Sequence, residues 1–260
     1  MYKFRALMNL ALGAALLAGG LATAATPKVE DILLASDAIR NPDEPFATDI
    51  HLTEYRNKKA EQEGAVVAYA KMNARRGQHD TLVRIVEPVR DRNKMMLKNG
   101  NEIWFYDPAS QSGMRISPQQ RLLGQASNGD VVTVNLAHDY KGVIEAEEAI
   151  IDGDRKERQS YRIKLTALTS AATYHTIEYW VERGTNRPVK SNFYAESGRL
   201  FKTAYYRRFE SQLGKDRPTE TIIIDGIDPQ LVTVMRYSNF RPKDIPDAWL
   251  RRDGLATVQD

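Results

Sequence analysis

Hydrophobic and polar residues alternate along most of this 260-residue chain, and this pattern predicts a protein built mainly of β-strands. In one segment Tyr161, Ile163 and Leu165 alternate with Arg162 and Lys164. Successive side chains of a strand point to opposite faces, so a period of two indicates one buried and one exposed face. The sequence therefore predicts an antiparallel sheet that is apolar on one side.

Turn signals separate the alternating segments at intervals of roughly 8–12 residues, which is typical of an antiparallel sheet of about ten strands. The strongest signal is Asn99-Gly100 between two apolar runs, because the central residues of a tight hairpin turn adopt positive φ. The segments with strand character are 46–56, 64–75, 78–86, 92–98, 102–107, 114–117, 143–152, 155–166, 173–182, 188–194, 200–211, 219–225 and 232–240.

Two longer segments depart from this period. Residues 29–40 have apolar positions at helical spacing and end before Asn41-Pro42, which predicts a short amphipathic helix. Residues 119–140 contain Gly124 and Asn128-Gly129 and have no regular period, which predicts a loop with one or two short helical turns. A long irregular segment inside a compact domain is often functional. We expect both segments to cover the open side of the sheet and to move when a ligand enters.

The predicted sheet has more apolar surface than its helices can cover. The helix at 29–40 and a short helix expected at 246–252 are too little for about ten strands. The sheet is therefore expected to curl on itself. This reasoning predicts a mainly β protein with few helices, a half-open antiparallel β-barrel whose apolar concave side is covered by short helices.

The first 24 residues have the three parts of a secretory signal peptide. Lys3 and Arg5 precede an uncharged apolar stretch that ends in the small-residue site Ala22-Thr23-Ala24. A membrane anchor is the alternative interpretation, but the run is short and rich in Ala and Gly, whereas a spanning helix needs about 20 predominantly apolar residues. We expect cleavage near Ala24, export to the periplasm, and a single domain over residues 25–260.

Charge and cysteine content exclude several classes of protein. Lys3 and Arg5 would leave with the leader, so the remaining chain would have 35 Lys and Arg against 34 Asp and Glu. A near-neutral chain without a basic block gives no case for nucleic-acid binding. The absence of cysteine excludes disulfides, thiolate metal sites and a lipid-modified cysteine after the leader. We expect a freely diffusing monomer.

Catalytic and metal-binding patterns are weak in this sequence. The four histidines are not paired at the short spacings of a zinc site, and G-x-S-x-G does not occur. His138-Asp139 could act as an acid–base pair, but adjacent residues on a strand point to opposite faces, which favours polar surface. The doublets Arg75-Arg76 and Arg207-Arg208 are either solvated strand ends or contacts for anionic headgroups. We expect no enzyme activity, no metal and no cofactor.

Three segments carry a resemblance to a known family. They are NGNEIWFYDPASQSGMRISPQQ at 99–120, the meander from YRIKL through YHTIEYWVE to RPVKSNFYAESGRLFK at 161–202, and TETIIIDG, LVTVMRYSNF and DIPDAWL at 219–250. With these segments the chain resembles the outer-membrane lipoprotein-sorting superfamily, which includes LolA- and LolB-like proteins, in its branch of larger single-domain relatives. The resemblance extends roughly from Phe46 to the end and contains no catalytic signature.

The resemblance implies an incomplete barrel that holds acyl chains of a lipid or lipoprotein in an apolar cavity. It implies a carrier between an inner-membrane exporter and an outer-membrane acceptor. The apolar residues that we expect to line such a cavity are Met95, Leu97, Ile103, Phe105, Met114, Ile163, Leu165, Ile177, Tyr179, Val181 and Phe193. Met95, Met96 and Met114 suit a surface that repacks around varied ligands.

Three alternatives stay open at this point. The same apolar residues could fill a solid core without a cavity. Envelope-stress regulators of the RseB type share the carrier fold, so a regulatory binding module without a transport role is compatible with the same sequence. An enzyme on a β scaffold would need an acid–base constellation that sequence spacing does not show.

Overall fold

The structure, a computed structural model, describes residues 27–258. After α1 (Val29–Arg40) come β1 (Phe46–Arg56), β2 (Lys59–Asn73), β3 (Gln78–Glu87), η1 (Val89–Asp91), β4 (Met95–Asn99), β5 (Glu102–Asp107) and β6 (Ser112–Ile116). Short elements follow: β7 (Arg121–Leu123), β8 (Ala126–Ser127), η2 (Asn128–Asp130) and α2 (Leu136–Asp139). The second half contains β9 (Tyr140–Ile151), β10 (Glu157–Ala167), β11 (Thr176–Glu182), β12 (Pro188–Tyr194), β13 (Leu200–Gln212), β14 (Lys215–Asp225), β15 (Leu231–Pro242), η3 (Asp247–Leu250) and η4 (Arg252–Thr257). The predicted leader, residues 1–24, lies outside the described residues.

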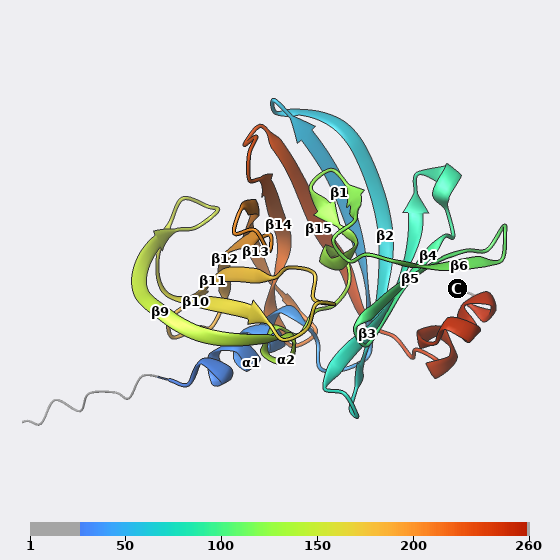
Figure 1. Ribbon diagram of the computed structural model, residues 1–260, viewed down its shortest axis with the longest axis horizontal. Coiled ribbons are helices and arrows are strands. Elements are labelled where there is room, and N and C mark those ends of the chain that lie inside the picture. Colours follow the sequence, from blue (N-terminus) through green and yellow to red (C-terminus); the bar gives the residue numbers. More distant parts are fainter. Residues whose placement is uncertain (1–26, 259–260) are drawn as a thin grey trace, which may run out of the picture.

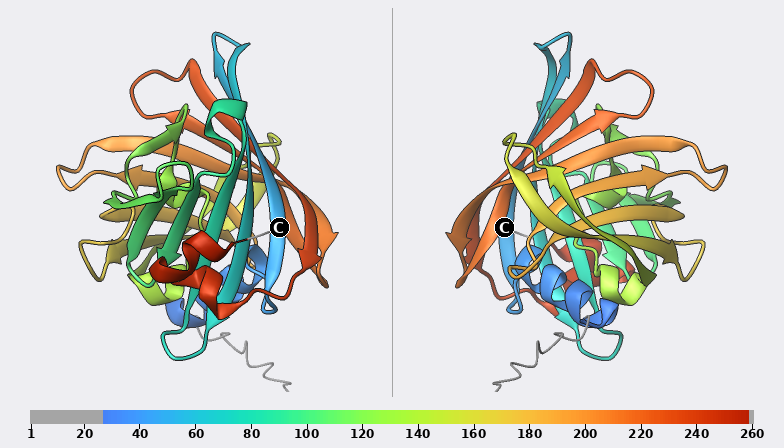
Figure 2. Two further views of the ribbon diagram at one scale, coloured as in Figure 1. Left: turned by 90° about the vertical axis from the view of Figure 1, so that its right-hand side faces the viewer. Right: turned by 90° about the vertical axis from the view of Figure 1, so that its left-hand side faces the viewer.

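Thirteen strands form one antiparallel sheet, in which most neighbours in space are also neighbours in the chain. The exception is the pairing of β1 with β15, which places Ile50 opposite Tyr237. β6 and β9 remain as the two edges, so the sheet is open. Figures 1 and 2 show it curving strongly around α1 and α2. The predicted mainly β antiparallel architecture with few helices is confirmed, but about ten strands was too few. The sheet stays open between β6 and β9.

Local predictions hold best where turns are tight. The predicted segments 29–40, 46–56, 102–107 and 188–194 coincide with α1, β1, β5 and β12. The hairpin between β4 and β5 is also present, but Asn99 pairs with Glu102, so its turn residues are Gly100 and Asn101. Gly100 has a φ of 59°, which fits a turn that requires glycine at its first central position.

Helix α1 lies against the concave side of the sheet and is fixed there by polar contacts (Figure 1). The hydroxyl oxygens of Ser36 and Tyr179 are 2.6 Å apart in the buried core. At the C-terminus of α1, the Arg217 guanidinium donates to the carbonyl oxygens of Ala38 and Ile39 at 2.8 and 2.9 Å. A basic side chain at a helix C-terminus satisfies carbonyls that have no partner within the helix. The C-terminal part of α1 is therefore positioned by the sheet.

A second, smaller core lies on the convex side, where η3 and η4 cover the strands around β4 (Figure 2). Met95 and Leu97 belong to this core together with Trp249. Met96 and Lys98, one residue out of phase, face the concave side. The prediction that Met95 and Leu97 line a concave cavity is wrong. Both faces of β4 are buried, so its apolar run did not indicate which residues point inward.

Candidate functional site beneath a crossing strap

The segment between the two edge strands, residues 117–139, crosses the concave side of the sheet, and we call it the strap (Figure 1). It contains the short elements from β7 to α2. Val131, Val132 and Leu136 of the strap are buried in the main core. The predicted irregular segment 119–140 therefore covers the concave face. Its movement stays a prediction.

Polar contacts join the strap to α1. The Asp37 carboxylate accepts a hydrogen bond from the backbone N–H of Ala137 at 2.9 Å. Arg40 and Asn41 both donate to the carbonyl oxygen of Val134, at 2.9 and 3.0 Å. Helix and strap therefore form one covering layer, held together by hydrogen bonds that can exchange with water.

The strap is also attached to β3. The backbone N–H and the Nδ1 of His79 lie 2.9 and 3.0 Å from Asn135 Oδ1, and its Nε2 lies 3.3 Å from the Pro42 carbonyl. Gln78 donates to the Asp139 carboxylate at 2.6 Å. Burial lowers the pKa of His79, against the opposite effect of the Asn135 contact. His79 therefore serves as a fixed attachment point for the strap.

A buried ion pair anchors the middle of the strap to β13. The ammonium of Lys202, whose side chain is 1% exposed, bonds the Asp130 carboxylate. It also donates to the Gln125 carbonyl at 3.0 Å and to Ser127 Oγ at 3.3 Å. The Tyr174 hydroxyl donates to Asp130 at 2.9 Å. Burial lowers the pKa of Lys202, and the charge of Asp130 opposes that shift.

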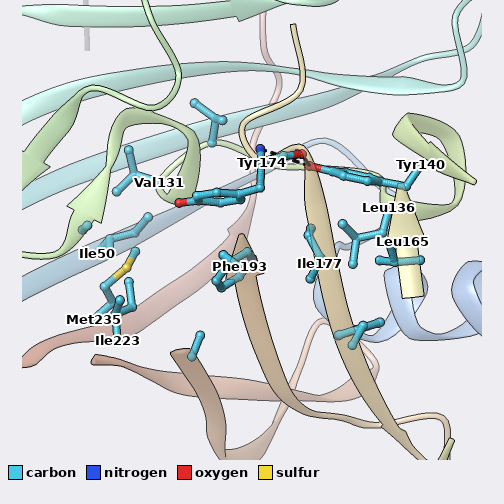
Figure 3. Packing of buried hydrophobic residues seen from close by; sticks show 14 of the residues in the cluster. Ile50, Val131, Leu136, Tyr140, Leu165, Tyr174, Ile177, Phe193, Ile223 and Met235 are labelled. Carbon is cyan, nitrogen blue, oxygen red and sulfur yellow. Dashed lines mark hydrogen bonds between the residues drawn. The ribbon is translucent and has the colours of Figure 1, made fainter. Parts of the chain in front are cut away.

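An apolar cavity of about 160 Å³ lies beneath the strap. Ile50, Ile223 and Met235 line it from the middle of the sheet, and Ile177 and Phe193 line it from β11 and β12 (Figure 3). An engineered apolar cavity of about 150 Å³ binds the six-carbon ring of benzene. The cavity therefore has room for a short apolar segment, and a longer acyl chain requires the covering layer to move.

Two further cavities adjoin the first. One of about 160 Å³ shares Val132, Val134, Tyr140 and Thr173 with it. Another of about 230 Å³ shares Thr173 and Tyr174. The strap and the loop at residues 168–175 thus divide the concave space into compartments. Displacing these two segments would join the compartments into a longer channel.

The sequence-predicted cavity residues are distributed over several places. Ile177 and Phe193 line the first cavity, and Ile103 lines the second. The buried core residues Ile163, Leu165, Tyr179 and Val181 do not line these cavities, and Phe105 packs against the same core. Met114 is 58% exposed on the edge strand β6, so its placement in a cavity is wrong. Ligand binding by the remaining residues stays a prediction.

Sequence reasoning missed the wall formed by the first and last strands. Ile50 and Ala68 come from β1 and β2, and Ala204, Ile223 and Met235 come from β13, β14 and β15. Each residue lies on the inward face of its strand. The pairing of β1 with β15 was the missing information, because it brings the first and last strands of the chain side by side at the cavity.

The remaining candidate groups have structural partners. His138 Nδ1 lies 3.1 Å from Asp139 Oδ1, because the two residues belong to the short helix α2 and not to a strand. The argument from strand geometry therefore does not apply to this pair, although the His138 side chain is exposed as expected of polar surface. Arg207 and Arg208 both lie 3.4 Å from the buried carboxylate of Glu220, which gives that doublet a structural role.

Within residues 27–258, no group of three or more His, Asp or Glu side chains is arranged to hold a metal ion. No helix in the same range combines the length and the apolar character needed to cross a membrane.

Comparison with known proteins places the chain in a family. The model of a family described only as "Uncharacterized protein" matches residues 77–257. A LolA superfamily protein from Nitrosomonas europaea has 31% sequence identity and a TM-score of 0.77, over 88% of this chain and 99% of that chain. No protein with a curated functional description matches the sequence.

Two more distant structures share the fold. A DUF1329 family protein from Desulfovibrio piger has 20% identity and a TM-score of 0.72, over 87% of this chain and 97% of that chain. An outer membrane lipoprotein-sorting protein domain from Vibrio parahaemolyticus has 14% identity and a TM-score of 0.69, with the same coverage. At these identities the two structures support the fold alone. The extent and identity of the match to the Nitrosomonas protein show that this chain belongs to the LolA superfamily.

Proposed function

We propose that this protein is a periplasmic carrier that binds an acyl chain of a lipid or lipid-modified protein beneath the strap. The observation that carries the proposal is the apolar cavity between the sheet and the strap, adjoined by two more cavities. Each CH₂ group moved from water into such a space contributes about 0.8 kcal/mol. Binding of this kind needs no covalent chemistry, so the proposed carrier is not an enzyme.

The proposal includes movement of the strap. Its contacts with α1 and β3 include hydrogen bonds through backbone and side-chain polar groups, such as those of Val134 and Asn135. Such bonds contribute about 0.5–1.5 kcal/mol each, because water replaces them when they open. Burial of an acyl chain offsets their loss. By analogy with lipoprotein sorting, an inner-membrane exporter would supply the ligand and an outer-membrane acceptor would take it.

The leucine substitution at Ala204 tests the cavity. Ala204 is buried in its wall, and Ala204→Leu places about three further carbon atoms in the space proposed for ligand. Displacing an equal number of ligand CH₂ groups would cost about 2 kcal/mol, which weakens binding by roughly 30-fold. Titration of a dodecyl ligand, followed by calorimetry, measures this change.

The matched control is Ala149→Leu, which adds the same atoms at an exposed position of the edge strand β9. It should leave the affinity unchanged. Thermal melts show whether either variant is destabilised. If Ala204→Leu folds poorly, the affinity of the unsubstituted protein for ligands from hexyl to dodecyl tests the cavity instead. Equal affinity of Ala204→Leu, or no gain in affinity with chain length, would contradict the proposal. Native mass spectrometry of protein taken from the periplasm should also show bound lipid.

A further inference from the structure

A buried lysine, Lys98, lines the second cavity, and binding of an apolar chain in the first cavity does not require its charge. Lys98 lies on the concave face of β4 and is 7% exposed. Its ammonium donates to the carbonyl oxygen of His79 at 3.0 Å, and no carboxylate of residues 27–258 lies at ion-pairing distance from it. An ammonium has three donors, and burying a charge without full compensation is unfavourable.

Lys202, also buried on the concave side, is a reference for an ammonium with three hydrogen-bond acceptors. Lys202 bonds a carboxylate, a carbonyl oxygen and a hydroxyl oxygen, from Asp130, Gln125 and Ser127. Lys98 is held by one protein acceptor. Two of its three N–H groups are therefore left for a group that enters the cavity.

The carboxylates nearest to Lys98 already have other partners. Asp80 is bonded through both oxygens to Arg76 at 2.6 Å. Asp139 lines the same cavity as Lys98 and accepts from Gln78 at 2.6 Å, with His138 at 3.1 Å. Asp139 opposes a fully anionic ligand at longer range, and its Oδ1 already accepts from Gln78. Lys98 is thus the cationic group of this cavity with free donors.

The position of this lysine next to the apolar cavity suggests a two-part ligand. The two cavities meet at Val132, Val134, Tyr140 and Thr173, so a chain in the first cavity can place its head group in the second when the strap moves. We propose that Lys98 binds the acidic oxygen group, a phosphate or carboxylate, at the head of the acyl ligand. This inference rests on the proposed function and specifies the ligand as an acidic amphiphile.

The test compares head groups on a constant chain. Dodecanoate and dodecyl phosphate carry acidic heads, and 1-dodecanoylglycerol is neutral. The unsubstituted protein should bind the acidic ligands at least tenfold more tightly than the neutral one. In Lys98→Met the neutral ligand should bind as before and the preference should fall to less than twofold. Replacing a buried charge with an apolar side chain of similar length is often tolerated by the fold.

Lys190→Met is the matched control, because Lys190 is a half-buried lysine on the convex side, against the ring of Trp180. It should keep the full head-group preference. Inorganic phosphate is the third probe, and it should bind far more weakly than dodecyl phosphate. Equal binding of the two would make this a site for free anions and would overturn the proposal.

Other results separate the two proposals. If the unsubstituted protein binds all dodecyl ligands equally, the role of Lys98 is refuted while the carrier function stands. If no dodecyl ligand binds, both proposals fail. If Lys98→Met does not fold, the affinities of the unsubstituted protein for acidic and neutral dodecyl ligands still test the proposed head-group preference.

Discussion

Replacing Lys202 with methionine is expected to lower the free energy of unfolding by about 3–5 kcal/mol, because it leaves a buried carboxylate without its counter-charge. The Lys202 ammonium is 1% exposed and the Asp130 side chain is 12% exposed. The same change removes hydrogen bonds to Gln125 and Ser127 of the strap. Urea unfolding followed by circular dichroism measures the loss.

The double substitution Lys202→Met with Asp130→Asn is the control for the charge. An asparagine keeps one oxygen to accept from the Tyr174 hydroxyl, so the double variant differs from Lys202→Met chiefly in lacking the unpaired buried carboxylate. The double variant should recover at least half of the stability lost in Lys202→Met, because buried ion pairs can be replaced by neutral groups at little cost. A loss below about 1 kcal/mol in Lys202→Met would show that the pair does not anchor the strap.

The same variant also reports on the strap itself. If the ion pair holds the middle of the strap, amide hydrogen exchange in residues 117–139 should increase more than exchange in the central strands. Ligand release should become faster, since the strap opens more often. Uniformly increased exchange would indicate global destabilisation without a specific effect on the strap.

The strands were predictable because their signals are local. A period of two and a turn every few residues are both read within one hairpin, and all but one of the adjacent pairings in the sheet join strands consecutive in the numbering. The pairing of β1 with β15 spans almost the whole chain. No short segment carries information about it, and the cavity wall formed by these strands was therefore missed.

The inward face of β4 was not predictable because both of its faces are buried. Met95 and Leu97 pack under η3 and η4, while Met96 and Lys98 face the strap. Alternation specifies a face only when one side is polar. Lys98 itself could have been identified from the sequence, since a lysine within an apolar run either lies at a strand edge or is a buried charge with a functional role.

Trp180, on the convex face of the sheet, is a second residue whose burial the alternation of polar and apolar residues does not predict. It lies on the same face of β11 as Glu178 and Glu182, yet it is 6% exposed. Its indole N–H donates to Glu148 at 2.7 Å, and the Lys190 ammonium lies 4.7 Å from its ring centre. Long charged side chains cover an aromatic ring on a face that the pattern marks as exposed. Burial on such a face depends on cross-strand partners.

Stability is expected to fall steeply above about pH 10.5, because buried tyrosines must ionise when the protein unfolds. Tyr140, Tyr174 and Tyr179 are at most 6% exposed, and burial raises the pKa of each. Tyrosines in the unfolded chain lose their protons near pH 10, whereas the folded protein retains them. The unfolded state then binds fewer protons, so the free energy of unfolding decreases as pH rises.

Buried and half-buried lysines act in the opposite direction at slightly lower pH. Burial lowers the pKa of Lys98 and Lys202, so between their folded values and about 10.5 the unfolded state binds more protons and stability increases with pH. Above about pH 10.5 this gain is complete and the tyrosines dominate. Three tyrosines together give a loss of about 4 kcal/mol per pH unit, enough to unfold a domain of ordinary stability within two or three units.

A pH titration that records tyrosinate absorbance and circular dichroism together should show the buried tyrosines ionising in one cooperative step with unfolding. Tyr179→Phe should reduce the slope of stability against pH by about 1.4 kcal/mol per pH unit, because one of the buried groups no longer titrates. Its neutral-pH stability should fall by about 1 kcal/mol, since the hydrogen bond to Ser36 is lost. Ionisation of every tyrosine near pH 10 with the circular dichroism unchanged would contradict the burial of these side chains. That result would also argue against the closed position of the strap, because Tyr140 and Tyr174 are buried around it.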